Sequence, residues 1–358
     1  MSLAVTVLKN SAVLLLFLLF ISCGTKNKEY ANNVFPYSQF PQEKELKGEV
    51  IELDTALFRY PFRIRIEGDK AIVLDLHGSD YYGHLFQYPS FRYLSSFGRR
   101  GDSPLEMLSM ENFRLHNHTL WTLDANKSEL TRLDFSSSGD SLLRDETVTL
   151  DEDILRPLDF AIYNDTTFVI PDYSGESRFL KVDCKGKLIE KIGTIPTTNK
   201  KALQEARPAL AQAWRSFLDY NSHNSVLATV TQLGEVVEIY NLKDSTHVIR
   251  VGEYDEPEFK VSDGYGIPTG IMGFSDVQVT DDAIYAVFHG TSFKDIARQS
   301  GRLPDGGKYI YVFSLKGEPL CKYVLDHYIY GIWVDEVTKT IMATDVNNDQ
   351  PILKFSFG

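Results

Sequence analysis

The chain has 358 residues, of which 43% are hydrophobic, and its 37 basic residues against 49 acidic residues give a formal net charge of −12. Such a surface repels polyphosphates and anionic headgroups, which argues against nucleic-acid binding and against broad contact with an anionic membrane. The chain contains no H-E-x-x-H, no G-x-S-x-G, no Walker-type loop and no Cys-x-x-C, so no motif predicts a cofactor, a metal or a reaction.

The N-terminal segment is typical of an export signal. An apolar run over residues 11–21 follows Lys9 and is shorter than the ~20 residues of a membrane span. The sequence F-I-S-C-G then resembles a bacterial lipobox, whose cysteine thiol receives a diacylglycerol before cleavage. This resemblance implies a lipoprotein signal peptide over residues 1–22, lipidation of Cys23 and a lipidated polar tether over residues 23–47. An ordinary secretory peptide with an incidental cysteine is the alternative.

Lipidated Cys23 places the protein in the cell envelope, at the periplasmic face of the inner or outer membrane, and the tether does not distinguish the two. The remaining cysteines are Cys184 and Cys321. We expect Cys184 in the outer turn of one repeat and Cys321 in the outer strand of another, whereas a disulfide needs Cα atoms within ~7 Å. The sequence therefore predicts two free thiols.

Six apolar runs recur along the rest of the chain at steps of 48 to 58 residues, ending near Asp75, Asp124, Asp172, Val230, Phe288 and Asp345. Period-two alternation and short turns rich in Asn, Asp and Gly predict four antiparallel strands around each run. The predicted fold is therefore all-β, a six-bladed β-propeller of four-stranded antiparallel blades over residues 48–358. The sixth repeat lacks its fourth strand, so we expect residues 48–53 to pair with residues 352–357 and close the ring.

One segment departs from this strand pattern. Residues 200–217 (KALQEARPALAQAWRSFL) are rich in Ala, Leu, Gln and Arg, which predicts a helical insertion over about 197–217 that Pro208 bends or divides. Two interpretations are open. The insertion is either a structured loop that packs Trp214 against the neighbouring blade or a dedicated partner-binding helix.

The long connections, at 99–110, 194–212, 253–273 and 289–307, all fall on one predicted face of the propeller. Binding residues usually lie on long loops of a rigid scaffold, so this face and the mouth of the central channel form the candidate binding site. Its aromatic and arginine side chains suit a sugar, a peptide or a protein surface. The candidate residues are His77, Tyr81, Tyr82, Arg99, Arg100, Tyr173, His289 and Asp345, with Arg207, Tyr254, Tyr265, Arg298 and Arg302 as further rim residues.

The segment FGRRGDSPLEM at 97–107 resembles the F-G-R-x-G-x-G-P-x-E-F segment of exported six-bladed propellers of the TolB-like, NHL-related group abundant in Bacteroidetes. That family implies a lipid-anchored propeller and no common activity. Arg99 and Arg100 could cradle an anion between glycines, or Arg99 could pair with Glu106 and fasten the loop to the next blade. The matching residues are Phe97, Gly98, Arg99, Gly101, Pro104 and Glu106, while Ser103 and Met107 depart from the pattern.

Two functional hypotheses follow. The first is a binding or scaffolding module for a protein, peptide or glycan partner, without catalysis. The second is a channel-centred hydrolase or lyase that acts on a glycan or lactone, with His77, His289 and tyrosines as acid–base groups. Residues 345–349 have the spacing of a calcium loop, but Gln350 replaces its glycine, so we predict no metal. Convergence of these histidines with Asp124, Asp172 and Asp345 would favour the enzyme, and an aromatic patch would favour binding.

Overall fold

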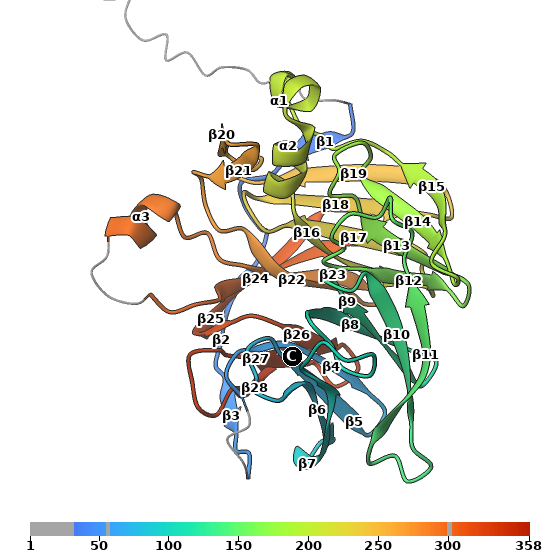
Figure 1. Cartoon of the computed structure of the whole chain (residues 1–358). Helices are drawn as coiled ribbons and strands as arrows, with labels where there is room; N and C mark the ends of the chain where they lie inside the picture. The colour runs from blue at the N-terminus through green and yellow to red at the C-terminus, as the bar shows by residue number, and fades with distance from the viewer. Residues whose placement is uncertain (1–31, 55–57, 299–302) are drawn as a thin grey trace, which may run out of the picture. The chain divides into compact units, whose positions relative to one another are not determined.

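The repeated apolar runs form the second strands of six sheets in the computed structural model, which describes residues 32–54, 58–298 and 303–358 (Figure 1). The predicted signal peptide and Cys23 lie outside the described residues. Residues 33–358 form one compact unit, which is described by itself below. Within the described residues, no helix is long and apolar enough to cross a membrane.

The first three blades have four antiparallel strands each, in sequence order across each sheet. They contain β4 (Pro61–Glu67), β5 (Lys70–Asp75), β6 (Tyr81–Gln87) and β7 (Arg92–Arg99) in blade 1; β8 (Met110–His116), β9 (Thr119–Asp124), β10 (Glu129–Phe135) and β11 (Leu142–Thr149) in blade 2; and β12 (Ala161–Asn164), β13 (Thr167–Pro171), β14 (Phe179–Asp183) and β15 (Leu188–Ile192) in blade 3.

The other three blades repeat this order with additions from the N-terminal segment. They contain β16 (Ser216–Asn221), β17 (Val226–Thr231), β18 (Val236–Asn241) and β19 (Thr246–Val251) in blade 4; β22 (Phe274–Val279), β23 (Ala283–Phe288), β24 (Gly307–Ser314) and β25 (Pro319–Ile329) in blade 5; and β26 (Ile332–Asp335), β27 (Thr340–Thr344) and β28 (Ile352–Ser356) in blade 6.

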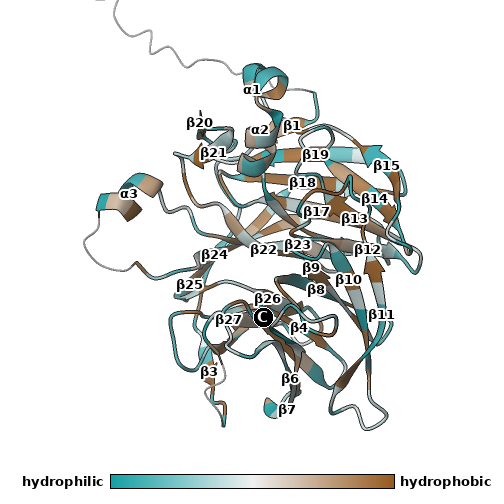
Figure 2. Cartoon of the chain, in the orientation of Figure 1, coloured by the Kyte–Doolittle hydropathy of each residue, from teal (hydrophilic) through white to brown (hydrophobic). Residues whose placement is uncertain are grey.

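The second strand of every blade is buried over nearly its whole length. Both faces of this strand pack against apolar side chains, so its sequence is a continuous apolar run, whereas the outer strands β11 and β15 are mostly exposed. The hydropathy colouring shows brown on β13 and β17, whereas the outer strand β19 is largely teal to white (Figure 2). This burial is the physical reason that the repeats are visible in the sequence.

The ring closes as predicted. Strand β3 (Glu49–Ile51) pairs antiparallel with β28 and completes blade 6, with Ile51 opposite Ile352. The backbone N–H of Leu53 also donates a hydrogen bond of 2.8 Å to the side-chain oxygen of Gln350. Closure of this kind covers a sheet edge that would otherwise pair with other chains.

The segment before this closing strand differs from the predicted polar tether. Strand β1 (Val34–Pro36) adds to blade 4 in parallel with β19, and β2 (Glu43–Leu46) adds to blade 5 in parallel with β25. Between them, the Tyr37 ring lies 5.4 Å from Phe313 and the Phe40 ring lies 4.7 Å from Tyr311, measured between centroids. Residues 34–46, here called the N-terminal strap, therefore give two blades a fifth strand, which the sequence pattern did not predict.

Removal of the strap is expected to destabilise the propeller. A chain that begins at Gly48 loses the partly buried Tyr37 and Phe40 rings, and this should lower the free energy of unfolding by about 3 kcal/mol relative to a chain that begins at Asn33. The uncovered edges of β19 and β25 should also promote association. Denaturant unfolding and size-exclusion chromatography test both effects, and equal stability with a monomeric elution would contradict them.

The insertion consists of two short helices, α1 (Lys200–Glu205) and α2 (Arg207–Ala213), and Pro208 lies in the first turn of α2. The side chain of Asn199 caps α1 by accepting a hydrogen bond of 3.0 Å from the backbone N–H of Ala202. Trp214 is 1% exposed in an apolar cluster that includes residues of β18 and β19. This supports the structured-loop interpretation, although the helices end at Ala213 and the rest of the predicted insertion enters β16.

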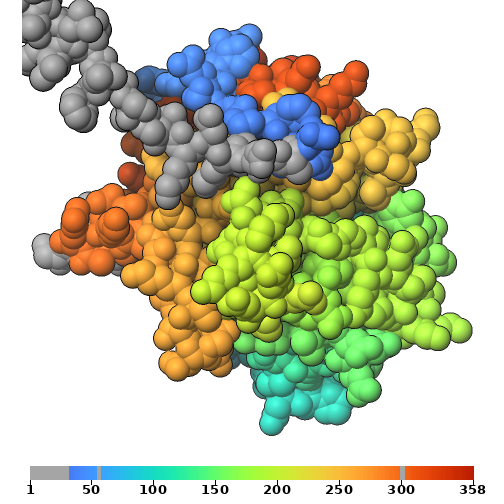
Figure 3. All heavy atoms as spheres, turned by 90° about the horizontal axis from the view of Figure 1, so that it is seen from above, coloured from blue at the N-terminus to red at the C-terminus, as the bar shows by residue number. Residues whose placement is uncertain are grey.

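Two further elements occupy long loops and were not predicted. A hairpin of β20 (Phe259–Ser262) and β21 (Tyr265–Pro268) follows blade 4, and α3 (Phe293–Arg298) lies between β23 and β24. The hairpin segment lies beside the yellow-green insertion on the surface in Figure 3, where the Gly266 N–H donates to the Gln212 side chain at 2.9 Å. Cys184 and Cys321 are free thiols, as predicted.

Candidate functional site

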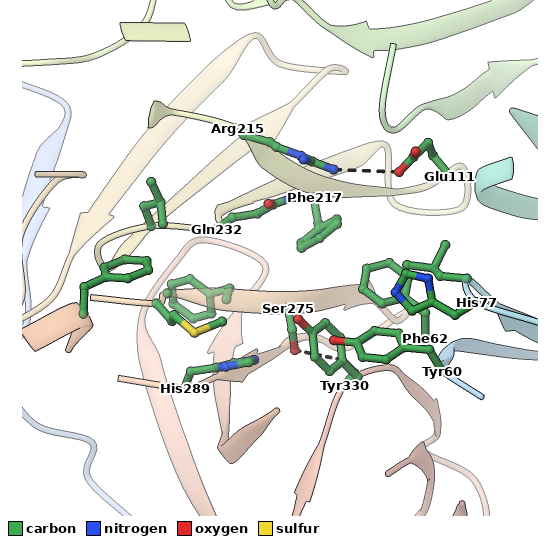
Figure 4. A pocket seen from close by; sticks show the side chains of 16 residues that line it. Tyr60, Phe62, His77, Glu111, Arg215, Phe217, Gln232, Ser275, His289 and Tyr330 are labelled. Carbon is green, nitrogen blue, oxygen red and sulfur yellow. Dashed lines mark hydrogen bonds and ion pairs between the residues drawn. The ribbon is translucent and has the colours of Figure 1, made fainter. Parts of the chain in front are cut away.

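A cavity of about 300 Å³ opens at the mouth of the central channel (Figure 4). Its lining comes from five blades: the entries to β4, β8, β16, β22 and β26, and the connections that follow β5, β17 and β23. These are inter-blade and second-to-third-strand connections, and they lie on the face predicted to carry the long loops, here called the loop-rich face. The cavity is here called the mouth pocket.

One wall of the mouth pocket is a row of four rings. His77 lies 4.9 Å from Tyr60, Tyr60 lies 5.5 Å from Tyr330, and Tyr330 lies 5.5 Å from His289, all between ring centroids. Phe62 packs behind the row, 5.0 Å from Tyr330. Figure 4 shows these rings on one side of the cavity. We call His77, Tyr60, Tyr330 and His289 the ring wall.

The two tyrosines of the ring wall are held in place. The Tyr60 hydroxyl donates a hydrogen bond of 2.6 Å to the Asp305 carboxylate, and the Ser275 hydroxyl donates to the Tyr330 backbone oxygen at 2.8 Å. Burial raises the pKa of both tyrosine hydroxyls, with neighbouring Tyr330 and Asp305 adding to the effect at Tyr60. Both therefore remain neutral hydrogen-bonding groups at physiological pH.

His289 is buried at the end of this wall. Burial lowers the pKa of His289 to about 4, against a weaker opposing effect of the Asp305 carboxylate. Its Nε2 atom has no hydrogen-bond partner in the part of the chain that the structure describes. The ring is therefore neutral at pH 7, with one unpaired polar atom in the lining of the mouth pocket.

Titration of His289 is expected to make the fold sensitive to acid. The folded state binds fewer protons at this site than the unfolded chain does between about pH 4 and pH 6.5, so stability falls as the pH falls through that window. The stability difference between wild type and His289→Gln should change by about 3 kcal/mol between pH 7 and pH 4. Denaturant unfolding at several pH values tests this, and parallel profiles for the two proteins would contradict it.

The charged residues of the mouth pocket lie on the wall opposite the ring wall. Arg215 and Glu111 form an ion pair of 3.8 Å, and the Arg215 side chain is 37% exposed. Figure 4 shows this pair across the cavity from the ring wall. Glu111 is the single carboxylate that lines the pocket within the described residues, so the pocket combines one weak ion pair with an extensive aromatic surface.

The channel below the pocket is filled by buried charges of the inner strands. The Arg63 guanidinium lies between the rings of Phe62 and Phe217, 4.1 and 4.3 Å from their centroids. Asp276 pairs with Arg63 at 3.3 Å and with Arg65 at 3.1 Å. Arg114 and Asp159 form a second buried pair of 2.6 Å. These side chains make the mouth pocket a blind cavity rather than the entrance to a pore.

β-Bulges turn the inner strands at the entrance to this buried network. The register of β4, β8 and β22 against their neighbours shifts at their first residues, next to Arg63, Asn112 and Asp276. A bulge re-aims the side chain that follows it, and here the polar side chains that follow are buried. The polar residues of the channel are therefore positioned by a repeated backbone feature.

A larger cavity of about 530 Å³ opens at the opposite mouth, and the two cavities share no lining residue within the described chain. Two of its acidic side chains, Asp281 and Asp335, are held by hydrogen bonds. Asp281 accepts from Asn221 at 2.9 Å, and Asp335 accepts from the backbone N–H of Val337 at 2.9 Å. The mouth pocket is therefore the better candidate site.

Of the predicted site residues, the structure brings together His77 and His289 in the mouth pocket. Tyr173 and Tyr265 line an adjacent cavity, and Tyr254 lines a third cavity under the N-terminal strap. Tyr81 and Arg99 are exposed and line none of these cavities, whereas Tyr82 and Asp345 are buried in structural roles.

The family-motif loop is fastened to the next blade. Arg99 pairs with Glu106 at 3.5 Å, and the ammonium group of Lys127 in blade 2 donates to the backbone oxygens of Ser103 and Glu106 at 2.7 and 2.6 Å. Arg100 stacks on Tyr82 at 3.6 Å and donates to the Leu76 backbone oxygen. These contacts favour the structural interpretation of the loop over an anion cradle.

The aspartates at the ends of the second strands hold loops in place. Asp75 accepts from the backbone N–H groups of residues 59, 60 and 77, and Asp124 accepts from those of residues 108, 109, 126 and 127. Asp172 and Asp345 accept from their own following loops. None of these four aspartates lines the mouth pocket together with His77 and His289. Within the described residues, no three His, Cys, Asp or Glu side chains form a potential metal site.

Sequence reasoning missed Tyr60, Tyr330, Arg215 and Glu111. Tyr60 and Arg215 directly precede the inner strands β4 and β16, Tyr330 lies two residues before β26, and Glu111 is the second residue of β8. Inter-blade connections enter the inner strands at the loop-rich face, so residues at these entries line the channel mouth. The signal available in the sequence was their position near the starts of the inner strands.

The family model of TolB-like six-bladed propellers matches residues 39–337. The chain belongs to the TolB-like propeller family. This confirms the family that the motif at 97–107 suggested, and the match runs through blades 1 to 5 to the first strand of blade 6. A search of curated protein sequences finds no match to this TolB-like chain.

Solved structures share the TolB-like architecture at low sequence identity. A protein described as exported from Bacteroides fragilis is 12% identical with a TM-score of 0.56, over 90% of this chain and 98% of that chain. A Bacteroides vulgatus protein is 10% identical with a TM-score of 0.55, over 88% and 98%. An auxiliary nutrient binding protein from Bacteroides ovatus is 10% identical with a TM-score of 0.52, over 84% and 70%. These likenesses establish the shared fold.

Proposed function

We propose that this TolB-like protein is an exported, lipid-anchored binding protein that holds a glycan in the mouth pocket. The observation that carries the proposal is the ring wall, four contiguous aromatic rings on one side of a blind cavity of about 300 Å³. A sugar has apolar C–H faces that pack on aromatic rings and hydroxyl groups that need polar partners. Tyr60, Tyr330 and His289 offer such partners without charge.

Binding is favoured over catalysis by the positions of the carboxylates. A hydrolase needs an acid and a base near the reacting atoms. Asp124, Asp172 and Asp345 are occupied by loop hydrogen bonds, and Asp305 accepts from Tyr60. His289 therefore serves as a neutral hydrogen-bonding group and His77 as a ring surface.

A glycan array and isothermal titration calorimetry test the binding proposal with the purified protein. Tyr60→Ala and Tyr330→Ala are each expected to weaken binding of a bound glycan at least tenfold, because each removes a ring from the wall. Tyr254→Ala is the matched control, since Tyr254 is 47% exposed and lines another cavity. Glycan affinity that survives both ring-wall variants would overturn the proposed site, and release of product from the glycan would favour the hydrolase or lyase.

Export and anchoring rest on the apolar run at 11–21 and on Cys23. Similar folds include a protein described as exported and a nutrient binding protein, so export and ligand binding have precedent in this architecture. Metabolic labelling with a fatty-acid probe should label the wild type and not Cys23→Ser, and the variant should leave the membrane fraction. An unlabelled wild type would contradict lipid anchoring.

A further inference from the structure

A second cavity of about 250 Å³ adjoins the mouth pocket on the loop-rich face. Arg215 lines both cavities, so this residue lies where the two meet. The second cavity extends from Arg215 to blade 3, the blade that contributes no residue to the mouth pocket lining. Its lining residues are Arg156, Leu158, Tyr173, Pro208, Gln212, Arg215, Gly264 and Tyr265.

The charge of this second cavity is opposite to that of the protein. Arg156 and Arg215 line it, and no carboxylate does so within the described residues, although the whole chain has a formal net charge of −12. The exposed Arg156 side chain makes no hydrogen bond or ion pair in the part of the chain that the structure describes. Among the described residues, Arg215 forms an ion pair with Glu111 alone, and at 3.8 Å this pair is weak. Two guanidinium groups are therefore available to an anion.

Neutral polar groups accompany these charges. The Tyr173 hydroxyl is buried and donates no hydrogen bond to the described residues, and burial raises its pKa to about 12, so it is protonated. Tyr265 projects from the hairpin with 60% of its surface exposed. An aromatic surface and an unpaired donor thus flank the two arginines.

The walls of this cavity are fixed by packing. Buried Trp214 holds α2 against blade 4, and the hydrogen bond between Gly266 and Gln212 joins the hairpin to the same helix. The helical insertion and the hairpin lie side by side in Figure 3. The cavity is therefore formed by elements that are packed against one another.

We propose that the two cavities form one groove for an acidic glycan. A sugar ring packs on the ring wall, and a neighbouring uronic acid places its carboxylate between Arg215 and Arg156. Arginine pairs with carboxylates through two parallel N–H groups, and two arginines in a cavity that no described carboxylate lines select an anion over a neutral sugar. This inference rests on the proposed function, because the mouth pocket must hold a sugar for its neighbour to reach Arg156.

Calorimetry with oligogalacturonates and with the same oligomers after reduction of their carboxyl groups to alcohols tests the inference on the purified protein. The acidic oligomers should bind at least tenfold more tightly than the reduced ones. Arg156→Gln should remove most of this difference and leave affinity for the reduced oligomers unchanged. Arg92→Gln is the matched control, because Arg92 is an exposed arginine that begins β7 after a turn of the opposite face.

The outcomes separate the two proposals. Equal binding of acidic and reduced oligomers, or an Arg156→Gln variant that keeps the acid preference, overturns the acidic groove and leaves the glycan site intact. An equal effect of Arg92→Gln also overturns it, because the preference would then come from overall charge. Binding of neither oligomer, together with no binding on a glycan array, overturns the proposed function itself.

Discussion

Replacement of Asp276 by alanine is expected to lower the free energy of unfolding by about 3–5 kcal/mol, because it leaves buried cations without their partner. Burial raises the pKa of Asp276, but Arg63 and Arg65 outweigh that effect and hold it below its ordinary value. Asp276 also accepts from the backbone N–H of Ile332 at 2.9 Å, which joins blades 5 and 6. Denaturant unfolding followed by tryptophan fluorescence measures the loss.

Lys191→Gln is the control for this variant. It breaks the ion pair between Lys191 and Glu176, whose side chains are 45% and 57% exposed. Exposed pairs contribute about 0–1 kcal/mol, so this variant should unfold nearly as the wild type does. Equal stabilities for Asp276→Ala and Lys191→Gln would show that the buried network does not hold the inner strands together.

Replacement of Trp214 by alanine is the second change with a large expected effect, a loss of about 3–5 kcal/mol from the free energy of unfolding. Trp214 is 1% exposed and packs with residues of α2, β18 and β19. Its removal leaves a cavity beneath α2. Chemical denaturation measures the loss, and limited proteolysis should show earlier cleavage within residues 197–213.

Leu105→Ala is the matched control, since Leu105 is 76% exposed and its replacement should change stability by less than about 0.5 kcal/mol. Unchanged stability of Trp214→Ala would contradict the packing role of the insertion. It would then favour the alternative from the sequence analysis, a helix reserved for a partner.

The architecture was predictable because its signals are local. The second strands are buried on both faces and therefore stand out as apolar runs, and the short turns mark the strand ends. The strap was missed because β1 and β2 are short and mostly exposed, with few apolar residues to produce a pattern. Their parallel pairing with β19 and β25 depends on partners about 200 or more residues away in the sequence.

The candidate site was predictable only in part. The position of long loops pointed to the face that holds the mouth pocket and to His77 and His289, which line it. The same reasoning also selected Tyr82 and Asp345, which the structure buries, because a sequence does not show whether a polar side chain near a loop serves a ligand or the loop itself. For the aspartates, the hydrogen bonds that they accept from backbone N–H groups show that their side chains hold the loops.

The sequence by itself determined the six repeats, their closure, the two free thiols and membership of the TolB-like family, because burial and turn geometry constrain neighbouring residues. The tertiary structure alone decided which side chains meet at the channel mouth. Tyr60, Tyr330 and His289 come from different blades, and their ring contacts exist only when the propeller closes. The same closure pairs Arg63 with Asp276 across 213 residues and makes the pocket blind.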